Sequence, residues 1–131
     1  MDRQTLHRLA TDWVDRRIHA LAWNSDLVLQ RQDIHPETEA EFDNLCDNTP
    51  EDCWQLVLEI LHMNHSDDVM LHLGLRLQLL IEKHPTDVIE LVEAQASRDP
   101  LFKDLLGWLL PSEPNSELWS RVRLVAGDVP W

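Results

Sequence analysis

Signals that begin a helix recur along this chain at short intervals, and they limit the chain to a succession of brief helices. The clearest are Thr49-Pro50, Ser66-Asp67-Asp68, Thr86-Asp87, Asp99-Pro100 and Ser116. Serine, threonine and aspartate accept hydrogen bonds from the free N–H groups of a helix's first turn, and proline fits there because it has no N–H to satisfy. Long alternation of period two and hairpin pairs such as Asn-Gly are both absent. The sequence therefore predicts an all-α fold.

Apolar residues spaced three and four apart between these signals predict about seven helices. The predicted ranges are 6–21, 36–46, 50–64, 67–83, 86–96, 100–109 and 116–125, and Ser25-Asp26 opens a further short element with Leu27, Val28 and Leu29. Short connections favour antiparallel neighbours. Two architectures fit: a compact bundle, or a short HEAT-like stack of helical hairpins. The length of 131 residues corresponds to a single helical domain, 1–131, with a short tail at 127–131.

The apolar pattern also predicts how deeply individual helices are buried. In the first helix, an apolar stripe that includes Trp13 and Ile18 faces the core. The helix over 67–83 is apolar nearly all round, so we expect it at the centre of the fold. The helix over 36–46 carries few apolar residues, so we expect it on the surface, with Pro36 at its first position.

A set of motifs in the second half of the chain resembles a known family. They are Pro50-x-x-x-Trp54, Gln78-Leu79-Leu80, Lys83-His84, Arg98-Asp99-Pro100-x-Phe102, Gly107-Trp108 and Trp119-x-x-Val122. Over about residues 50–125 the chain resembles a small bacterial helical family that is known only as a domain of unknown function. The resemblance implies an all-helical fold and a bacterial or phage origin, and it implies no activity. In that family a glutamate is common where this chain has Gln78, so no chemistry of that glutamate carries over.

The charge of the chain is strongly acidic and unevenly placed. The formal net charge is −13, from 24 acidic and 11 basic residues, and no Lys or Arg occurs from Gln32 to Leu75, where eleven acids lie. This sign disfavours direct binding to nucleic acid and to anionic membranes. It favours a basic protein partner. The alternative interpretation is a solvated acidic face that aids solubility. The predicted partner-binding residues are Glu37, Glu39, Glu41, Asp43, Asp47, Glu51 and Asp52.

Three functions remain open on this pattern. The leading hypothesis is a non-enzymatic inhibitor whose acidic surface, at about 32–68, docks on a basic partner, as an immunity protein, an antitoxin or a phage-encoded inhibitor does; the partner could be a nuclease toxin. The second is a structural or adaptor module that self-associates through its Trp-bearing helices, as a homo-oligomer. The third is a metal-dependent enzyme. Phosphate-binding glycine loops and nucleophile motifs such as G-x-S-x-G are absent from the sequence.

The metal hypothesis depends on a cluster of histidine and aspartate. His62, His65, Asp68 and His72 fall at the end of one predicted helix and the start of the next, and imidazole with carboxylate suits zinc, nickel or iron. Helix capping and ordinary surface positions explain these residue types equally simply. We therefore expect no cofactor and no catalytic residue, and we hold the four as weak candidates for a metal site.

Several single residues carry further expectations. Arg76 lies on the most apolar helix, and we expect it to face outward beside His72 and Glu82; if it is buried, it must pair with a carboxylate. Cys46 and Cys53 are expected to be free thiols that fill apolar space. Trp23 and the terminal Trp131 either anchor a partner or fold over the core, whereas the tryptophans on apolar helix faces, Trp13, Trp54, Trp108 and Trp119, belong to the core. The start of the chain lacks an apolar signal segment, which predicts a cytoplasmic location.

Overall fold

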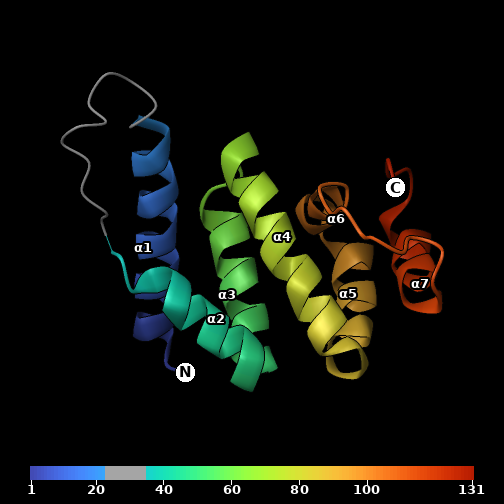
Figure 1. The fold of residues 1–131 in the computed structure, drawn as a ribbon, viewed down its shortest axis with the longest axis horizontal. Coiled ribbons are helices and arrows are strands. Elements are labelled where there is room, and N and C mark those ends of the chain that lie inside the picture. Colours follow the sequence, from blue (N-terminus) through green and yellow to red (C-terminus); the bar gives the residue numbers. More distant parts are fainter. Residues whose placement is uncertain (23–34) are drawn as a thin grey trace.

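The computed structural model describes residues 1–22 and 35–131, and within these ranges it is all-α with seven helices (Figure 1). Their bounds are α1 Arg3–Ala22, α2 Thr38–Asn48, α3 Pro50–Met63, α4 Asp67–Lys83, α5 Pro85–Arg98, α6 Pro100–Leu106 and α7 Glu117–Ala126. The predicted all-α class is confirmed. The predicted short element after Ser25-Asp26 and the residue Trp23 lie outside the described residues.

The predicted start signals mark helix boundaries in two ways. Asp99 and Ser116 are true caps, because the Asp99 carboxylate accepts from the backbone N–H groups of Leu101 and Phe102, and the Ser116 hydroxyl accepts from that of Trp119 at 3.3 Å. Thr49 and Ser66 also precede helices but make no side-chain cap. There the local backbone and the proline or acids that follow define the start.

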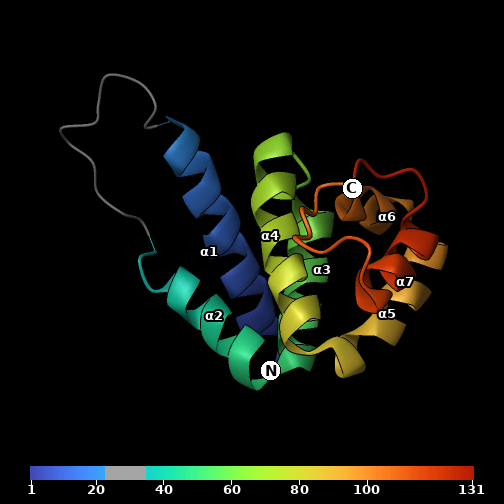
Figure 2. The same ribbon diagram turned by 45° about the vertical axis from the view of Figure 1, so that its right-hand side comes forward.

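The helices form two layers. α1, α3, α5 and α7 contact one another in that order in one layer, and α2, α4 and α6 do so in the other. The pairs α1–α2, α3–α4 and α5–α6 are successive hairpins. Figure 1 shows this succession running from α1 on the left to α7 on the right, and Figure 2 shows α4 in front of α3. Of the two predicted architectures, this order of contacts is that of the hairpin stack.

One hydrophobic core runs through all seven helices. It includes side chains with no exposed area, such as Phe42 of α2, Leu77 of α4 and Phe102 of α6. Trp13, Trp54 and Trp119 belong to it as predicted, and Trp108 packs against it. No described helix combines the length and the apolar character needed to cross a membrane.

One prediction about α2 holds and one is wrong. The helix lies at the surface as expected, with one face, Thr38, Phe42 and Cys46, buried against α1, α3 and α4. The helix begins at Thr38 and not at Pro36, because the residues before it form a turn in which the Thr38 N–H donates to the His35 carbonyl at 3.1 Å. His35 adopts a positive φ of 48°, which a continuing helix does not allow.

Two predictions about burial are wrong. Ile18 is 51% exposed, because among the described side chains of α1 the core extends only as far as Val14. α4 lies centrally, yet it is not buried all round: Leu71, Leu75 and Leu79 are 40%, 42% and 53% exposed. A helix in the middle of a two-layer stack has neighbours at its sides and behind it, and its remaining face meets solvent.

The C-terminal tail folds back on the stack. Gly127 ends α7 with a positive φ of 78°, the conformation that glycine adopts without strain. The Trp131 indole N–H donates to the Leu106 carbonyl at 3.1 Å, and its ring meets that of Trp119 edge-on at 5.7 Å. Trp131 therefore covers the core, and the alternative that it stands free as an anchor for a partner is wrong.

Candidate functional site

The acidic residues of α2 are largely paired with bases from other helices. Glu41 accepts a hydrogen bond from the Arg8 guanidinium of α1 at 3.2 Å. The Glu39 carboxylate lies 3.7 Å from the guanidinium of Arg17, also on α1. Asp47 pairs with Lys83 at the end of α4. The acidic residues of α2 are therefore compensated in the fold, because α1 and α4 supply the cations.

Arg76 binds α2 to α4 most directly. Its guanidinium donates to Glu39 and to Asp43, and it lies 4.9 Å above the centre of the Phe42 ring. The side chain is only 16% exposed. Burial opposes the charge, but the hydrogen bonds and charges of Asp43 and Glu39 outweigh it and raise the pKa of Arg76. The expectation that Arg76 faces outward is wrong, because its side chain is largely buried and paired with two carboxylates.

The remaining predicted partner-binding residues lie at helix starts. Glu37 precedes α2 and is exposed, and Glu51 is exposed in the first turn of α3. Asp52 lies beside Glu51, 3.5 Å from the N-terminal amine of Met1. Within the described part of the chain, no ion pair involves Glu37 or Glu51. Of the seven predicted residues, Glu51 and Asp52 lie next to acidic residues of another helix, and together they form a feature that the sequence pattern did not reveal.

That feature is a groove of about 500 Å³ between the first turns of α3 and α5. Its polar lining consists of Glu51 and Asp52 from α3 and Asp87 and Glu90 from α5, with Thr49 at the rim. Pro50, Val88 and Leu91 supply the apolar part of the lining, and Leu91 is 38% exposed. Among the residues that the structure describes, no basic side chain lines the groove. Four carboxylates around an apolar floor make a surface suited to a cationic group that carries an apolar stem.

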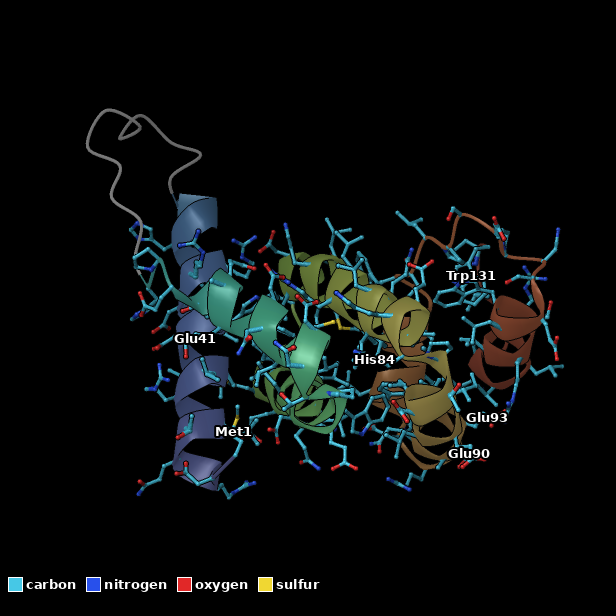
Figure 3. The ribbon with its side chains drawn as sticks, turned by 60° about the horizontal axis from the view of Figure 1, so that its bottom comes forward. Met1, Glu41, His84, Glu90, Glu93 and Trp131 are labelled. Carbon is cyan, nitrogen blue, oxygen red and sulfur yellow. The ribbon has the colours of Figure 1, made fainter. Side chains whose placement is uncertain are left out.

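The surroundings of Glu90 extend this acidic character along α5. Figure 3 looks toward this end of the molecule and shows Glu90 and Glu93 following one another on α5. The guanidinium of Arg121 on α7 donates two hydrogen bonds to the Glu93 carboxylate, at 2.7 and 2.8 Å. The hydrogen bonds from Arg121 lower the pKa of Glu93. Arg121 therefore pairs with Glu93, and Glu90 also interacts electrostatically with it. The groove carboxylates Glu51, Asp87 and Glu90 have no ion pair among the described residues.

Sequence reasoning missed Asp87 and Glu90 as parts of this site. The prediction that Thr86-Asp87 caps this helix is wrong, because α5 begins at Pro85 with His84 at the N-cap position, so Asp87 lies within its first turn. Acids in the first turn of a helix stabilise its dipole, so their presence alone gives no sign of a site. The missing information is that the starts of α3 and α5, far apart in sequence, lie side by side.

The predicted metal cluster is not assembled. The His62 ring lies 2.8 Å from the Asp99 carboxylate, and His72 bonds the Asp68 carbonyl at 2.9 Å within its own helix. Across residues 1–22 and 35–131, no three His, Cys, Asp or Glu side chains converge in a way that holds a metal ion. His65 is exposed beyond the end of α3. Three of the four residues, His62, Asp68 and His72, serve two separate local contacts, so the predicted cluster does not come together among the described residues.

Asp99 is instead a structural centre. Burial disfavours its charge, but hydrogen bonds from Gln95, from His62 and from the backbone N–H of Phe102 outweigh burial and lower the pKa of Asp99. The same carboxylate thereby links the end of α3, the end of α5 and the start of α6.

The cysteines offer no reactive thiol. Cys46 and Cys53 are free and buried. Burial raises the pKa of both thiols, most strongly for Cys53. A thiol reacts as the thiolate, so both side chains act as apolar filling, as predicted.

A comparison with family models decides which proteins this chain is related to. One model, described as a family of unknown function, matches residues 28–129 of the 131-residue chain. The chain belongs to DUF6869. The DUF6869 match confirms the resemblance seen over residues 50–125 and extends it to α2, while α1 lies outside it. No curated protein and no solved structure matches the chain.

The DUF6869 range includes every residue of the acidic groove. It excludes Arg8, Arg16 and Arg17 of α1, whose guanidinium groups lie near the carboxylates of α2. The groove is thus built entirely from the part of the chain that defines the family, whereas the neutralisation of α2 draws partly on a helix outside that part.

Proposed function

We propose that this protein is a non-catalytic binding protein that docks a basic protein partner in the acidic groove between α3 and α5. The observation that carries the proposal is the set of groove carboxylates, Glu51, Asp87 and Glu90, which have no ion pair among the described residues. Most carboxylates of α2 are already paired within the chain, so they offer a partner less. We therefore place the proposed contact with the partner at the starts of α3 and α5, rather than on α2 as the sequence predicted.

The shape and chemistry of the groove suit a lysine or arginine side chain. Its volume of about 500 Å³ accepts a long side chain, Val88 and Leu91 meet the aliphatic stem, and the carboxylates meet the charged head. A net charge of −13 adds long-range attraction toward a basic partner. An immunity protein or antitoxin that masks the nucleic-acid-binding surface of a toxin is the concrete form of this proposal.

The experiment uses a short arginine- and lysine-rich peptide as the probe, with fluorescence anisotropy at physiological salt. The groove variant combines Glu51→Gln, Asp87→Asn and Glu90→Gln. The control combines Asp104→Asn, Glu113→Gln and Asp128→Asn, three exposed acids away from the groove that change the net charge by the same amount. We expect the groove variant to bind about tenfold more weakly than wild type and the control to bind within about twofold of it.

Equal losses in the two triple variants would mean that the peptide responds to total charge, and the proposal would then fail. Circular dichroism of both variants checks that the helices are retained. A second measurement captures partners from a lysate of the source cell at low and moderate salt. A basic protein retained by wild type and by the control but lost by the groove variant is the expected result, and equal retention by all three contradicts the proposal.

A further inference from the structure

A row of five exposed residues runs along the outward face of α4. The row consists of Asp67, Leu71, Leu75, Leu79 and Lys83, each four positions after the last, and all five are exposed. Side chains spaced by four form one ridge on a helix. The ridge is apolar over its three leucines, with an acid at one end and a base at the other.

The ridge lies between two different borders. On one side, Arg76 and Lys83 hold the carboxylates of α2 in ion pairs, which form a polar rim. On the other side, the Gln78 amide holds the backbone of Leu110 through two hydrogen bonds of 2.7 and 3.1 Å, and the Leu110 side chain is 65% exposed. Figure 2 shows the loop after α6 passing beside α4. Leu110 thus widens the apolar surface of the ridge.

The charges of the ridge are complementary to those of a second copy of the ridge that runs in the opposite direction. Asp67 and Lys83 lie eight residues before and eight after Leu75, and Leu71 and Leu79 lie four before and four after it. We propose that this face binds a second copy of the chain, with the two α4 helices antiparallel about a two-fold axis at Leu75. Leu71 then packs beside Leu79 of the second copy, and Asp67 lies near its Lys83.

The geometry follows the common mode in which ridges of period four pack together, with helix axes crossing at about 50°. Leu75 meets its own copy, because it lies on the two-fold axis, whereas every residue off the axis meets a different residue of the second copy. Lys83 is already beside Asp47 and has a flexible stem, so it can bind an additional carboxylate from the second copy. Parallel alignment would instead set acid against acid, which disfavours it.

The expected dimer is weak. Three leucines and Leu110 provide an interface at the low end of the range for specific association, below about 1,200 Å² in total. Two chains of net charge −13 also repel one another, and salt screens this repulsion more than it weakens apolar contact. Association is therefore expected in the micromolar range and is stronger at physiological salt than at low salt.

Sedimentation equilibrium of the full chain tests this proposal, from low micromolar to several hundred micromolar at physiological salt. We expect a concentration-dependent shift toward the dimer mass. Leu75→Lys places two like charges at the axis and should weaken dimerisation by about tenfold or more. The matched control is Leu124→Lys on α7, where the leucine is 84% exposed and lies outside the ridge; it should leave dimerisation unchanged. Both sites are exposed helix positions, where lysine is a good helix former.

A charge exchange tests the antiparallel arrangement. Asp67→Lys and Lys83→Glu should each weaken dimerisation when studied alone, because each sets like charges together at both ends of the ridge. An equal mixture of the two variants restores opposite charges at both ends and should dimerise about as well as wild type. A chain that stays monomeric throughout the concentration range, or equal effects of the two leucine variants, would overturn the proposal. So would a mixture no stronger than its components.

Discussion

Replacing Arg76 by methionine tests the central electrostatic contact of the fold. Methionine keeps an unbranched apolar stem of similar length but removes the guanidinium, so the contact with Phe42 loses its charge and Glu39 and Asp43 lose their partner. The Arg76 side chain is 16% exposed, whereas the carboxylates are 30% and 61% exposed. Water can therefore solvate the two acids once the cation is gone.

The size of the effect follows from these exposures. Removing one member of a fully buried pair costs about 3–5 kcal/mol, and an exposed pair contributes about 0–1 kcal/mol. A buried cation with partly exposed acids falls between these limits, and the lost interaction with the Phe42 ring adds about 0.5–1 kcal/mol. We expect Arg76→Met to lower the free energy of unfolding by about 2 kcal/mol. For 131 residues this corresponds to a fall in Tm of about 7 °C.

Chemical denaturation followed by tryptophan fluorescence and circular dichroism measures this change. Arg8→Met is the matched control, because Arg8 also pairs with two acids but its side chain is 50% exposed; its effect should stay within about 0.5 kcal/mol. A double-mutant cycle with Asp43→Asn should give a coupling energy above about 0.5 kcal/mol. The reasoning is refuted if Arg76→Met stays within about 0.5 kcal/mol of wild type, or if Arg8→Met loses as much stability.

Three further predictions concern other contacts. Asp99→Ala removes the cap of α6 and should lower the free energy of unfolding by about 1–2 kcal/mol at pH 7. Folding lowers the pKa of Asp99, so the stability that its carboxylate contributes is present above pH 3.8, the ordinary pKa. An acid titration of stability should show this contribution being lost as the pH falls below that value. Gln78→Glu removes the donor to the Leu110 carbonyl and should cost about 1 kcal/mol in chemical denaturation, whereas no loss would contradict the paired arrangement. Cys46 and Cys53 should react with a thiol reagent at least about tenfold more slowly in the native protein than in denaturant, and equal rates would show that they are accessible.

Local sequence signals predicted the helices well because helix starts are determined within a few residues. Asp99 shows this clearly: a cap followed by a proline needs no knowledge of the rest of the chain. The burial of α4 was not predictable in the same way. Leu75 and Leu77 have the same chemistry, yet Leu75 is 42% exposed and Leu77 is fully buried. Which side of a helix meets its neighbours depends on the tertiary arrangement, and composition does not carry that information.

The candidate site was predictable only in part for a similar reason. The segment from Gln32 to Leu75 predicts an acidic surface, and two of its residues, Glu51 and Asp52, line the groove. The partners of that segment were invisible, because Arg76 reaches acids 33 and 37 residues earlier in the chain. Charge counted along the sequence therefore overestimates the charge that α2 presents to a partner.

The layered order of the helices has a consequence for how the molecule opens. Among the described helices, α7 contacts only α5 and α6, and α1 contacts only α2, α3 and α4. In such an arrangement, stability accumulates from contacts between neighbours, and each end can open without the other. Amide hydrogens of α7 should exchange with solvent through fraying that leaves α1 closed, and the slowest exchange belongs to α3 and α4, through which the two ends are joined.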